Sequence, residues 1–438
     1  MKRTIYLSVI MLVVAFSASS QFVPKPMNFP GTGYYPSVIS IVDHTHCWFG
    51  VARAGWLPYS YAVHTNDGGE TFKFDSIPVG GFPVMQDACA VDSLTCYYAM
   101  TDSFITFSIW KTTDGGNSWQ KKTTNQFLGG YLNDYYAFSA DTGVAIGNPN
   151  DDYFEIQITN DGGDTWTRVP SANIPSMQNG ETAFRHQTSA IGNTIWFPTN
   201  KGRCFKSVDK GLNWTVSSPM PSSEIRCDVK FSSPDIGVFH TILGDNIFYK
   251  TADGGASWAA DTLPFNDMVM FMSSVEGFSE GFIFTTHSED YTNNVYFTPD
   301  FFNTVVLIQS GMTLNGPIRF KDAATGWLGG LAMPTNDIFY FTDVLTSVSN
   351  AGKTPEKLAI IPNPSSGEAL VKIPASLDSK SLRLLIIDMN GKIMEKRAIT
   401  NSTGWTKLNA AGYANGNYFV EILSGNRFIA REIWVVNH

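Results

Sequence analysis

One eight-residue pattern recurs through the first three quarters of the chain and constrains the fold more than any other feature. Its fullest copy runs from Thr159 to Trp166 and reads Thr-Asn-Asp-Gly-Gly-Asp-Thr-Trp. The third residue, an aspartate, recurs at intervals of 43 to 48 residues. A regular period of this length indicates a supersecondary unit that stacks on copies of itself. The aspartates that mark the seven copies are Asp67, Asp114, Asp161, Asp209, Asp253, Asp300 and Asp343.

The residue types of this pattern are those of a tight turn. A short aspartate side chain accepts hydrogen bonds from nearby backbone amides, the Gly-Gly pair supplies positive φ, and Thr or Ser adds a local hydrogen bond. The Trp or Phe that ends most copies is a large apolar side chain suited to fill the space between neighbouring sheets. Calcium binding is the alternative, but the spacing lacks the alternate oxygen ligands and closing Glu of an EF-hand loop. We therefore interpret the seven aspartates as structural.

The pattern resembles the Asp-box, or BNR, repeat of sialidase-type β-propellers. That resemblance implies a four-stranded blade per repeat, with the pattern between the third and fourth strands. Segments between the copies alternate as strands do, and no sustained helical period occurs. Gly147–Phe154, Asn179–Phe184 and Arg203–Asp209 also resemble the photosystem II assembly-factor-like propellers, which are usually taken as binding modules. We predict an all-β chain with a seven-bladed propeller over residues 21–345, closed into a ring by Phe22–Phe29.

The N-terminal residues 1–20 read as a signal peptide. Lys2-Arg3 precedes an apolar run from Ile5 to Phe16, and small residues follow up to a predicted cleavage site before Gln21. The run is too short for a membrane span, and no second span follows, so we predict no membrane span in the mature chain.

A second domain is predicted at the C-terminus, over residues 358–438, after a polar linker at 346–357. Its motifs Pro-Asn-Pro-x-x-Gly, Asp-x-Asn-Gly-Lys and Gly-x-Tyr come in that order, beginning at Pro362, Asp388 and Gly416. They resemble the C-terminal (Por) sorting domain of type IX secretion cargo in the Bacteroidetes. The resemblance implies a small β-sandwich, the type IX secretion machinery as partner, and a secreted or surface-attached protein.

Charge and cysteine content exclude further classes. A net charge of −9, with lysines and arginines scattered along the chain, argues against nucleic-acid binding. Five cysteines occur, without a Cys-x-x-Cys pair, so neither a zinc ribbon nor a thioredoxin-like redox site is predicted. Cys89 and Cys96 flank a predicted hairpin turn, where a cross-strand disulfide is possible, and Cys204 with Cys227 is a second candidate pair. We predict no metal or cofactor.

Catalysis is not the preferred interpretation of the propeller. A sialidase needs three arginines around a carboxylate, and none of the arginines here has the Phe/Tyr-Arg-Ile-Pro context, so the triad is not apparent from sequence. A glycosidase needs only two suitably spaced carboxylates. Candidates are Asp151, Asp152 and Glu155 in or beside the blade-three loop, and Glu181 before blade four. We interpret them as solvated loop charges and a Glu–Arg pair, and retain a glycan-cleaving hydrolase as the alternative.

Non-catalytic binding of a glycan or a protein on the loop face is the function that the sequence favours. Trp56 and Tyr59 lie in a Gly- and Pro-punctuated segment that is typical of a surface loop. Arg185 and His186 follow Glu181 in the connection to blade four. These four residues are the predicted ligand-binding candidates, and the identity of the ligand stays open.

Overall fold

The computed structural model describes most of the chain from Gln21 onward. The described residues are 21–29, 33–53, 60–75, 77–79, 83–101, 106–123, 126–127, 130–220, 226–242, 247–263, 266–288, 293–312, 316–329, 337–342, 345, 358–373, 382–388, 393–399, 404–424 and 427–438. The predicted signal peptide and the predicted linker lie outside them.

Seven four-stranded antiparallel sheets occupy the described residues between Phe22 and Phe341. The first three contain β2 (Tyr34–Ile41), β3 (Cys47–Arg53), β4 (Ser60–Thr65) and β5 (Lys73–Asp75); β6 (Val84–Ala90), β7 (Cys96–Thr101), β8 (Phe107–Thr112) and β9 (Gln120–Lys121); and β10 (Leu132–Ala137), β11 (Gly143–Asn150), β12 (Tyr153–Thr159) and β13 (Thr167–Arg168). A short 3-10 helix, η1 (Ser171–Asn173), leads to the fourth sheet.

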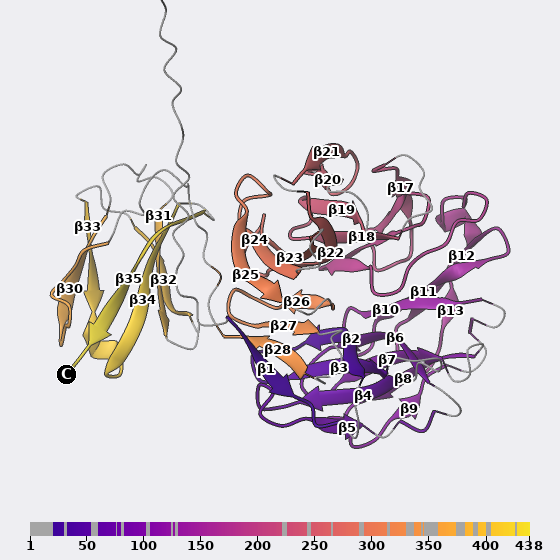
Figure 1. The fold of residues 1–438 in the computed structure, drawn as a ribbon, viewed down its shortest axis with the longest axis horizontal. Coiled ribbons are helices and arrows are strands. Elements are labelled where there is room, and N and C mark those ends of the chain that lie inside the picture. The colour runs from indigo at the N-terminus through magenta and orange to yellow at the C-terminus, as the bar shows by residue number, and fades with distance from the viewer. Residues whose placement is uncertain are drawn as a thin grey trace, which may run out of the picture.

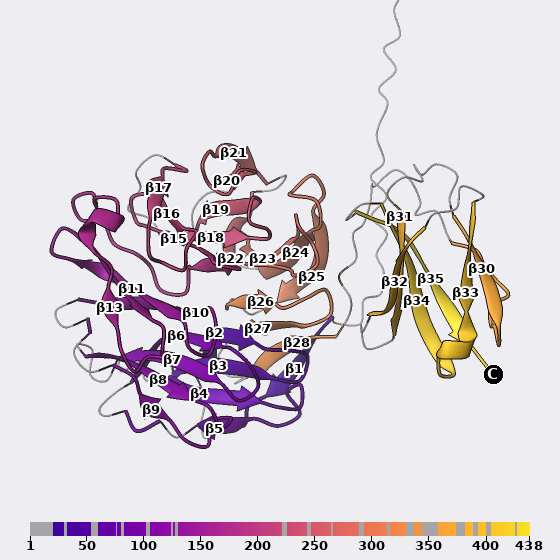
Figure 2. The same cartoon turned by 180° about the vertical axis from the view of Figure 1, so that it is seen from behind.

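The other four sheets continue in chain order. They contain β14 (Ser189–Ile191), β15 (Thr194–Pro198), β16 (Cys204–Ser207) and β17 (Thr215–Ser217); β18 (Cys227–Phe231), β19 (Gly237–Thr241), β20 (Ile247–Thr251) and β21 (Ala259–Thr262); β22 (Met268–Ser274), β23 (Phe282–His287), β24 (Asn293–Thr298) and β25 (Val306–Met312); and β26 (Ile318–Phe320), β27 (Gly326–Gly329), β28 (Asp337–Phe341) and β1 (Phe22–Pro26). The sheets follow one another around a common centre, toward which the first strand of each sheet lies (Figure 1, Figure 2). The predicted all-β propeller is thereby confirmed.

The ring closes through the N-terminal strand. Strand β1 pairs with β28 from Phe22 opposite Phe341 to Pro26 opposite Asp337, so the last sheet takes its outer strand from the start of the chain. The carbonyl of Gln21 also accepts a hydrogen bond from the backbone N–H of Thr342. Phe22 is buried and its ring packs against those of Phe320 and Phe341. Closure occurs where the sequence predicted it, over the shorter range Phe22–Pro26.

Each repeat turn is held by the same set of hydrogen bonds, shown best around Asp161. Its Oδ1 accepts from the hydroxyl of Thr159 at 2.9 Å and the N–H of Thr165 at 2.8 Å, and its Oδ2 accepts from the hydroxyl of Thr165. Gly162 and Gly163 take φ of 72° and 93°, which side chains with a Cβ rarely adopt. The hydrogen bonds to Thr165 hold the pKa of Asp161 down to about 2. Equivalent hydrogen bonds occur at Asp67, Asp114, Asp209, Asp253 and Asp300, and Asp343 lies outside the described residues.

The Trp or Phe that ends each of the first five copies packs onto the preceding sheet. The indole of Trp166 donates to the carbonyl of Lys122, at the end of the second sheet, at 2.7 Å. The ring of Trp119 is buried against Trp48 of the first sheet and Tyr98 of its own. Each of these turns therefore joins two neighbouring sheets.

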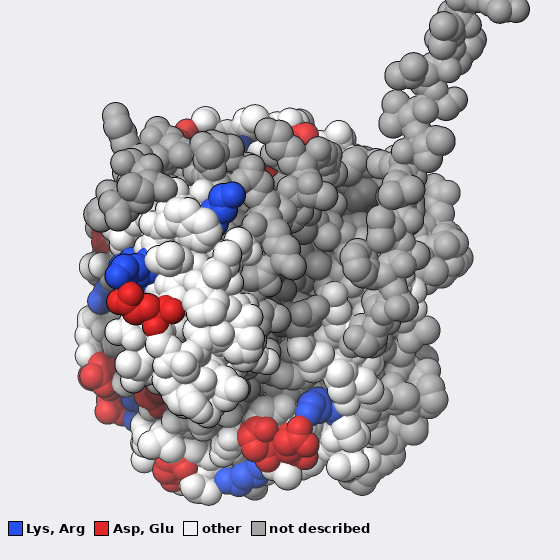
Figure 3. All heavy atoms as spheres, turned by 90° about the vertical axis from the view of Figure 1, so that its left-hand side faces the viewer, with Lys and Arg blue, Asp and Glu red and all other residues white. Residues whose placement is uncertain are grey.

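A separate apolar core lies in the C-terminal sandwich, defined here as the seven strands from Ile360 to Val436. Buried Val371, Ile386, Leu408 and Trp434 share this core, and they come from both of its sheets. On the face drawn in Figure 3, the described charged side chains of both signs are scattered over an otherwise uncharged surface. The seven strands of the C-terminal sandwich are β29 (Ile360–Ile361), β30 (Glu368–Lys372), β31 (Leu382–Asp388), β32 (Ile393–Ala398), β33 (Trp405–Asn409), β34 (Gly416–Ser424) and β35 (Arg427–Val436). A 3-10 helix, η3 (Ala410–Gly412), follows β33.

The cysteine prediction was wrong. All five cysteines are buried and carry free thiols. Cys89 on β6 lies opposite Tyr97 on β7, so Cys96 is one position away and points to the other face of the sheet. Cys204 and Cys227 lie in one apolar cluster without a disulfide between them.

No helix among the described residues is long and apolar enough to cross a membrane.

We predict that Phe22→Ala destabilises the propeller by about 3 to 5 kcal/mol, because it leaves a cavity where the ring closes. The measurement is urea unfolding followed by tryptophan fluorescence. Phe74→Ala is the matched control, since Phe74 is 39% exposed and should cost roughly 1 kcal/mol or less. Equal losses in the two variants would contradict the role given to β1.

We also predict that Asp161→Ala lowers the unfolding midpoint more at pH 6 than at pH 3. The folded pKa of Asp161 lies below its unfolded value, so its stabilisation is complete above the unfolded pKa and is lost as the pH falls through about 2. Thermal unfolding at both pH values measures the gap between wild type and variant. Asp164→Ala is the control, because Asp164 is 67% exposed. A gap that stays constant with pH would be evidence against the hydrogen-bonded, ionised carboxylate.

Candidate functional site

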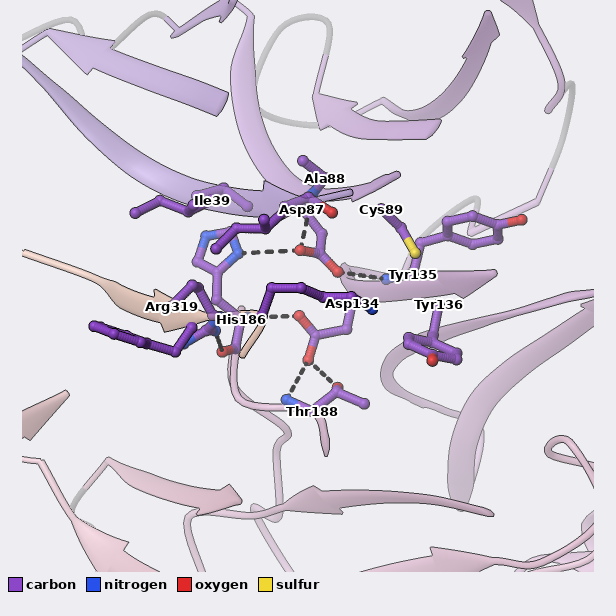
Figure 4. Close-up of a pocket in the computed structure, with 15 residues that line it drawn as sticks. Ile39, Asp87, Ala88, Cys89, Asp134, Tyr135, Tyr136, His186, Thr188 and Arg319 are labelled. Atoms are coloured by element: carbon purple, nitrogen blue, oxygen red, sulfur yellow. Dashed lines mark hydrogen bonds and ion pairs between the residues drawn. The ribbon is translucent and has the colours of Figure 1, made fainter. Parts of the chain in front are cut away.

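A cavity of about 250 Å³ opens among the first strands of the sheets, at the centre of the ring. Strands β2, β6, β10 and β26 line it, together with the segment that leads into β14. Its polar lining consists mainly of Asp87, Asp134, His186, Thr188 and Arg319 (Figure 4). Side chains from four separate sheets therefore meet at one place.

Two aspartates, Asp134 buried and Asp87 partly buried, enter this cavity from equivalent positions. Asp87 follows a register shift after Met85 in β6, and Asp134 follows a register shift after Leu132 in β10. Such a β-bulge bends the strand and redirects the next side chain. The two bulges thus turn both carboxylates toward the same space.

The carboxylate of Asp134 holds the segment before β14 in place. Its Oδ1 accepts from the backbone N–H of His186 at 2.5 Å, and its Oδ2 accepts from the N–H and the hydroxyl of Thr188. Asp87 accepts from the backbone N–H of Ala88 at 2.8 Å and of Tyr135 at 3.1 Å. Backbone N–H groups therefore satisfy part of the hydrogen-bonding capacity of each carboxylate.

The pKa values of Asp87 and Asp134 are both raised above the ordinary value of an aspartate. Burial raises the pKa of Asp87 to about 7, although the hydrogen bonds from Tyr135 and Ala88 and the charges of Arg319 and Lys230 oppose the change. Burial and then the nearby charge of Asp87 raise the pKa of Asp134 to about 6. Among the described residues, no lysine or arginine forms an ion pair with either group. Close, buried acids without a cationic partner disfavour double ionisation.

His186 adopts a conformation that its neighbours impose. Its φ is +62°, in the left-handed region, and its N–H bond to Asp134 holds it there. The imidazole Nδ1 lies 3.6 Å from Oδ1 of Asp87, and it is buried without a hydrogen-bond partner among the described residues. Burial lowers the pKa of His186 to about 3, so the ring is neutral near pH 7.

Three arginines surround the same histidine, and all three depress its pKa. Arg319 donates to the carbonyl of His186 at 3.3 Å, Arg185 donates to Gln86 Oε1 at 3.4 Å, and Arg226 donates to the carbonyl of Arg185 at 3.4 Å. Within the described part of the chain, no carboxylate forms an ion pair with any of these guanidinium groups. They form a cationic group beside the cavity.

The predicted carboxylates of the third blade lie elsewhere. Strand β11 extends to Asn150, so Asp151 and Asp152 form a tight, exposed hairpin turn and not a broad loop. Asp151 pairs with Arg168 at 3.2 Å. Glu155 is buried on β12, 2.8 Å from Nε of the same arginine.

Glu181 is buried in an ion pair. Its Oε2 accepts from Arg203 at 2.7 Å, and its Oε1 accepts from the hydroxyl of Thr199 at 2.6 Å. The Glu–Arg pair that the sequence suggested thus involves Arg203 and not Arg185.

Of the predicted ligand-binding candidates, His186 lines the central cavity, and Arg185 precedes it and donates to Gln86 outside the cavity lining. Trp56 and Tyr59 lie outside the described residues. Sequence reasoning did not identify Asp87, Asp134, Arg226 or Arg319. The first two had a detectable signal, because they lie equally far before the turn aspartates Asp114 and Asp161. An alignment of the repeats on those turns places them at one position.

We predict that Glu181→Gln destabilises the protein by about 3 to 5 kcal/mol, because it leaves the charge of Arg203 buried and unpaired. Chemical unfolding at pH 7 measures the loss. Asp151→Asn should cost about 1 kcal/mol or less, since the Asp151 side chain is 71% exposed. If the two variants were equally stable, Glu181 would not have the structural role that its contacts indicate.

Comparison with known proteins identifies the C-terminal part of the chain. Residues 359–436 match the family described as the secretion system C-terminal sorting domain. The match indicates secretion through the type IX system, to the extracellular space or the cell surface. No curated protein matches the chain at a significant level.

Solved structures resemble the propeller in fold. YCF48 bound to D1 peptide superposes with a TM-score of 0.56 at 14% identity, over 76% of this chain and 99% of that one. YCF48 from Cyanidioschyzon merolae gives 0.54 at 14% identity, over 73% and 98%. The GH74 enzyme of Niastella koreensis gives 0.51 at 15% identity, over 92% of this chain and 73% of the enzyme. At these identities the likeness concerns the fold alone.

Proposed function

We propose that this exported protein is a non-catalytic binding module that captures a carboxylate-bearing ligand, from a protein or an acidic glycan, at the centre of the propeller. The observation that carries the proposal is the group of Arg185, Arg226 and Arg319 around His186, without carboxylate partners among the described residues. Guanidinium groups bind carboxylates through strong, charge-assisted hydrogen bonds.

The three arginines differ in how far they reach solvent. Arg226 is exposed, whereas Arg185 and Arg319 are half-buried, and Arg319 lines the cavity. All three use hydrogen bonds to carbonyl or amide oxygens, which leave the rest of each five-donor guanidinium group available. A ligand carboxylate would therefore meet several positive donors, one of them directly accessible.

The size of the cavity suggests where the rest of the ligand lies. Ligand pockets commonly enclose about 300 to 1,000 Å³, so a space of about 250 Å³ holds a terminal group and not a whole chain. We infer that the ligand inserts its anionic end and lies across the mouth of the cavity. The structurally similar YCF48 has been solved with a peptide bound, which supports a polypeptide as one class of ligand for this fold.

A glycan-cleaving hydrolase is the second candidate, and one observation favours it. Asp87 and Asp134 form a close pair of acids with raised pKa values in the central cavity, as a general acid requires. Both oxygens of Asp134, however, accept hydrogen bonds from His186 or Thr188, and the cavity is too small to enclose a sugar chain. Binding is therefore the better-supported function.

We predict that the purified protein retains peptides with a free C-terminal carboxylate, or glycans that carry sialic or uronic acids, and releases no sugar. Arg185→Ala and Arg226→Ala should each weaken binding at least about tenfold, because each removes a charged hydrogen-bond donor. The measurement is a peptide and glycan panel in which bound ligand and released sugar are followed together.

Lys73→Ala is the matched control, since it removes one positive charge from an exposed lysine away from the cavity. Two kinds of ligand without a carboxylate test whether that group is recognised. They are peptides with a C-terminal amide, and glycans in which the carboxylate of the sialic acid has been reduced to an alcohol. Binding that survives both arginine changes would overturn the proposed site. Sugar release that disappears in Asp87→Asn would establish the hydrolase instead.

A further inference from the structure

We propose that Asp87, Asp134 and His186 form a binding site for one divalent transition-metal ion in the central cavity of the propeller. One donor atom from each of the three side chains lies within 4.8 Å of the other two. The inference goes beyond the anionic ligand proposed above, and its test uses the metal alone, so that either proposal can fail without the other.

The spacing of the donors fits coordination better than a direct hydrogen bond. Nδ1 of His186 and Oδ1 of Asp87 are 3.6 Å apart, beyond the usual hydrogen-bond range. Two ligands about 2.1 Å from a tetrahedral ion lie about 3.4 Å apart. The buried Nδ1 has no hydrogen-bond partner among the described residues, and its ring is turned toward Asp87 (Figure 4). A metal ion between the two side chains would use this lone pair.

The cationic side chains nearest to the two acids are engaged with other groups. Arg319 donates hydrogen bonds to the carbonyls of Met272, Ile318 and His186 and forms no ion pair with a carboxylate among the described residues. The ammonium group of Lys230 is held by Asp228. Asp87 and Asp134 therefore form no ion pair with a lysine or arginine among the described residues, although the charges of Arg319 and Lys230 act on Asp87 over a longer distance. Placing two acids this close, with one of them buried, is costly unless a proton or a metal ion neutralises the pair.

The donor set indicates the class of metal. Imidazole nitrogen suits zinc and its neighbours in the first transition row, and carboxylate oxygen is a common companion ligand. Three protein ligands leave at least one position for water or for a ligand group. Hydrogen bonds from Thr188 to Asp134 and from the backbone N–H of Tyr135 to Asp87 orient the two carboxylates.

Such an ion would connect parts of the ring that are distant in sequence. Asp87 belongs to the second sheet, Asp134 to the third, and His186 to the segment that enters the fourth. Because a bound ion must be present in the folded state only, it would stabilise the closed ring.

Titration calorimetry with ZnCl2 tests the proposal on tag-free protein that has been stripped with a chelator. We expect one ion bound per chain, and a loss of affinity of about 100-fold or more in Asp134→Asn and His186→Gln. His44→Gln is the matched control for an exposed histidine and should bind as wild type does. Circular dichroism establishes that each variant is folded.

The proposal is overturned if wild type binds no Zn²⁺, or if His186→Gln binds it with unchanged affinity. Should both variants misfold, anomalous diffraction from zinc-soaked crystals of wild type decides the question. A peak within coordination distance of all three side chains supports the site. Peaks at other histidines alone, or no peak, overturn it.

Discussion

The propeller depends on the contact between each repeat turn and the sheet before it. A single twisted four-stranded sheet has two faces to cover, and here each face is covered by the next sheet in the ring. The turn supplies the contact in two ways, because its aspartate fixes the loop and its aromatic side chain then inserts between the sheets. Trp166 shows both effects, since it follows Asp161 and hydrogen-bonds to Lys122 of the preceding sheet.

A second link runs in the opposite direction along the ring. In three of the repeats, the residue three positions before the turn aspartate contacts a turn of the following sheet. Lys111 donates to the carbonyl of Ala140 at 2.7 Å, and Lys250 donates to the carbonyl of Phe301 at 2.9 Å. At the same position His64 forms a buried pair with Asp75, close to Gly116 of the next turn. The turns thus add links between sheets, and most of the packing between neighbouring sheets comes from their inner strands, such as β2 and β3 against β6.

The repeat turns depend on local residues, whereas the central cavity depends on the arrangement of the whole ring. This difference explains how much of the structure could be predicted from sequence. The repeat turns and the closure by Phe22 depend on local residue types at a regular period, so the chain itself reveals them. The position of Asp87 depends on a bulge after Met85, and no residue type near it indicates a bulge. The meeting of Asp87 with His186 depends on the geometry of the whole ring. Burial, and with it the raised pKa of Asp87, follows only from that geometry.

One short segment brings the two charged groups of the cavity together. The backbone N–H of His186 donates to Asp134, and its carbonyl accepts from Arg319. Arg185 precedes His186, and the carbonyl of Arg185 accepts a hydrogen bond from Arg226. A ligand that moved the arginines would therefore act on peptide groups that also hold the acid pair. Because both contacts pass through residues 185–188, the proposed anion capture and the proposed neutralisation of the acids would be coupled at this site.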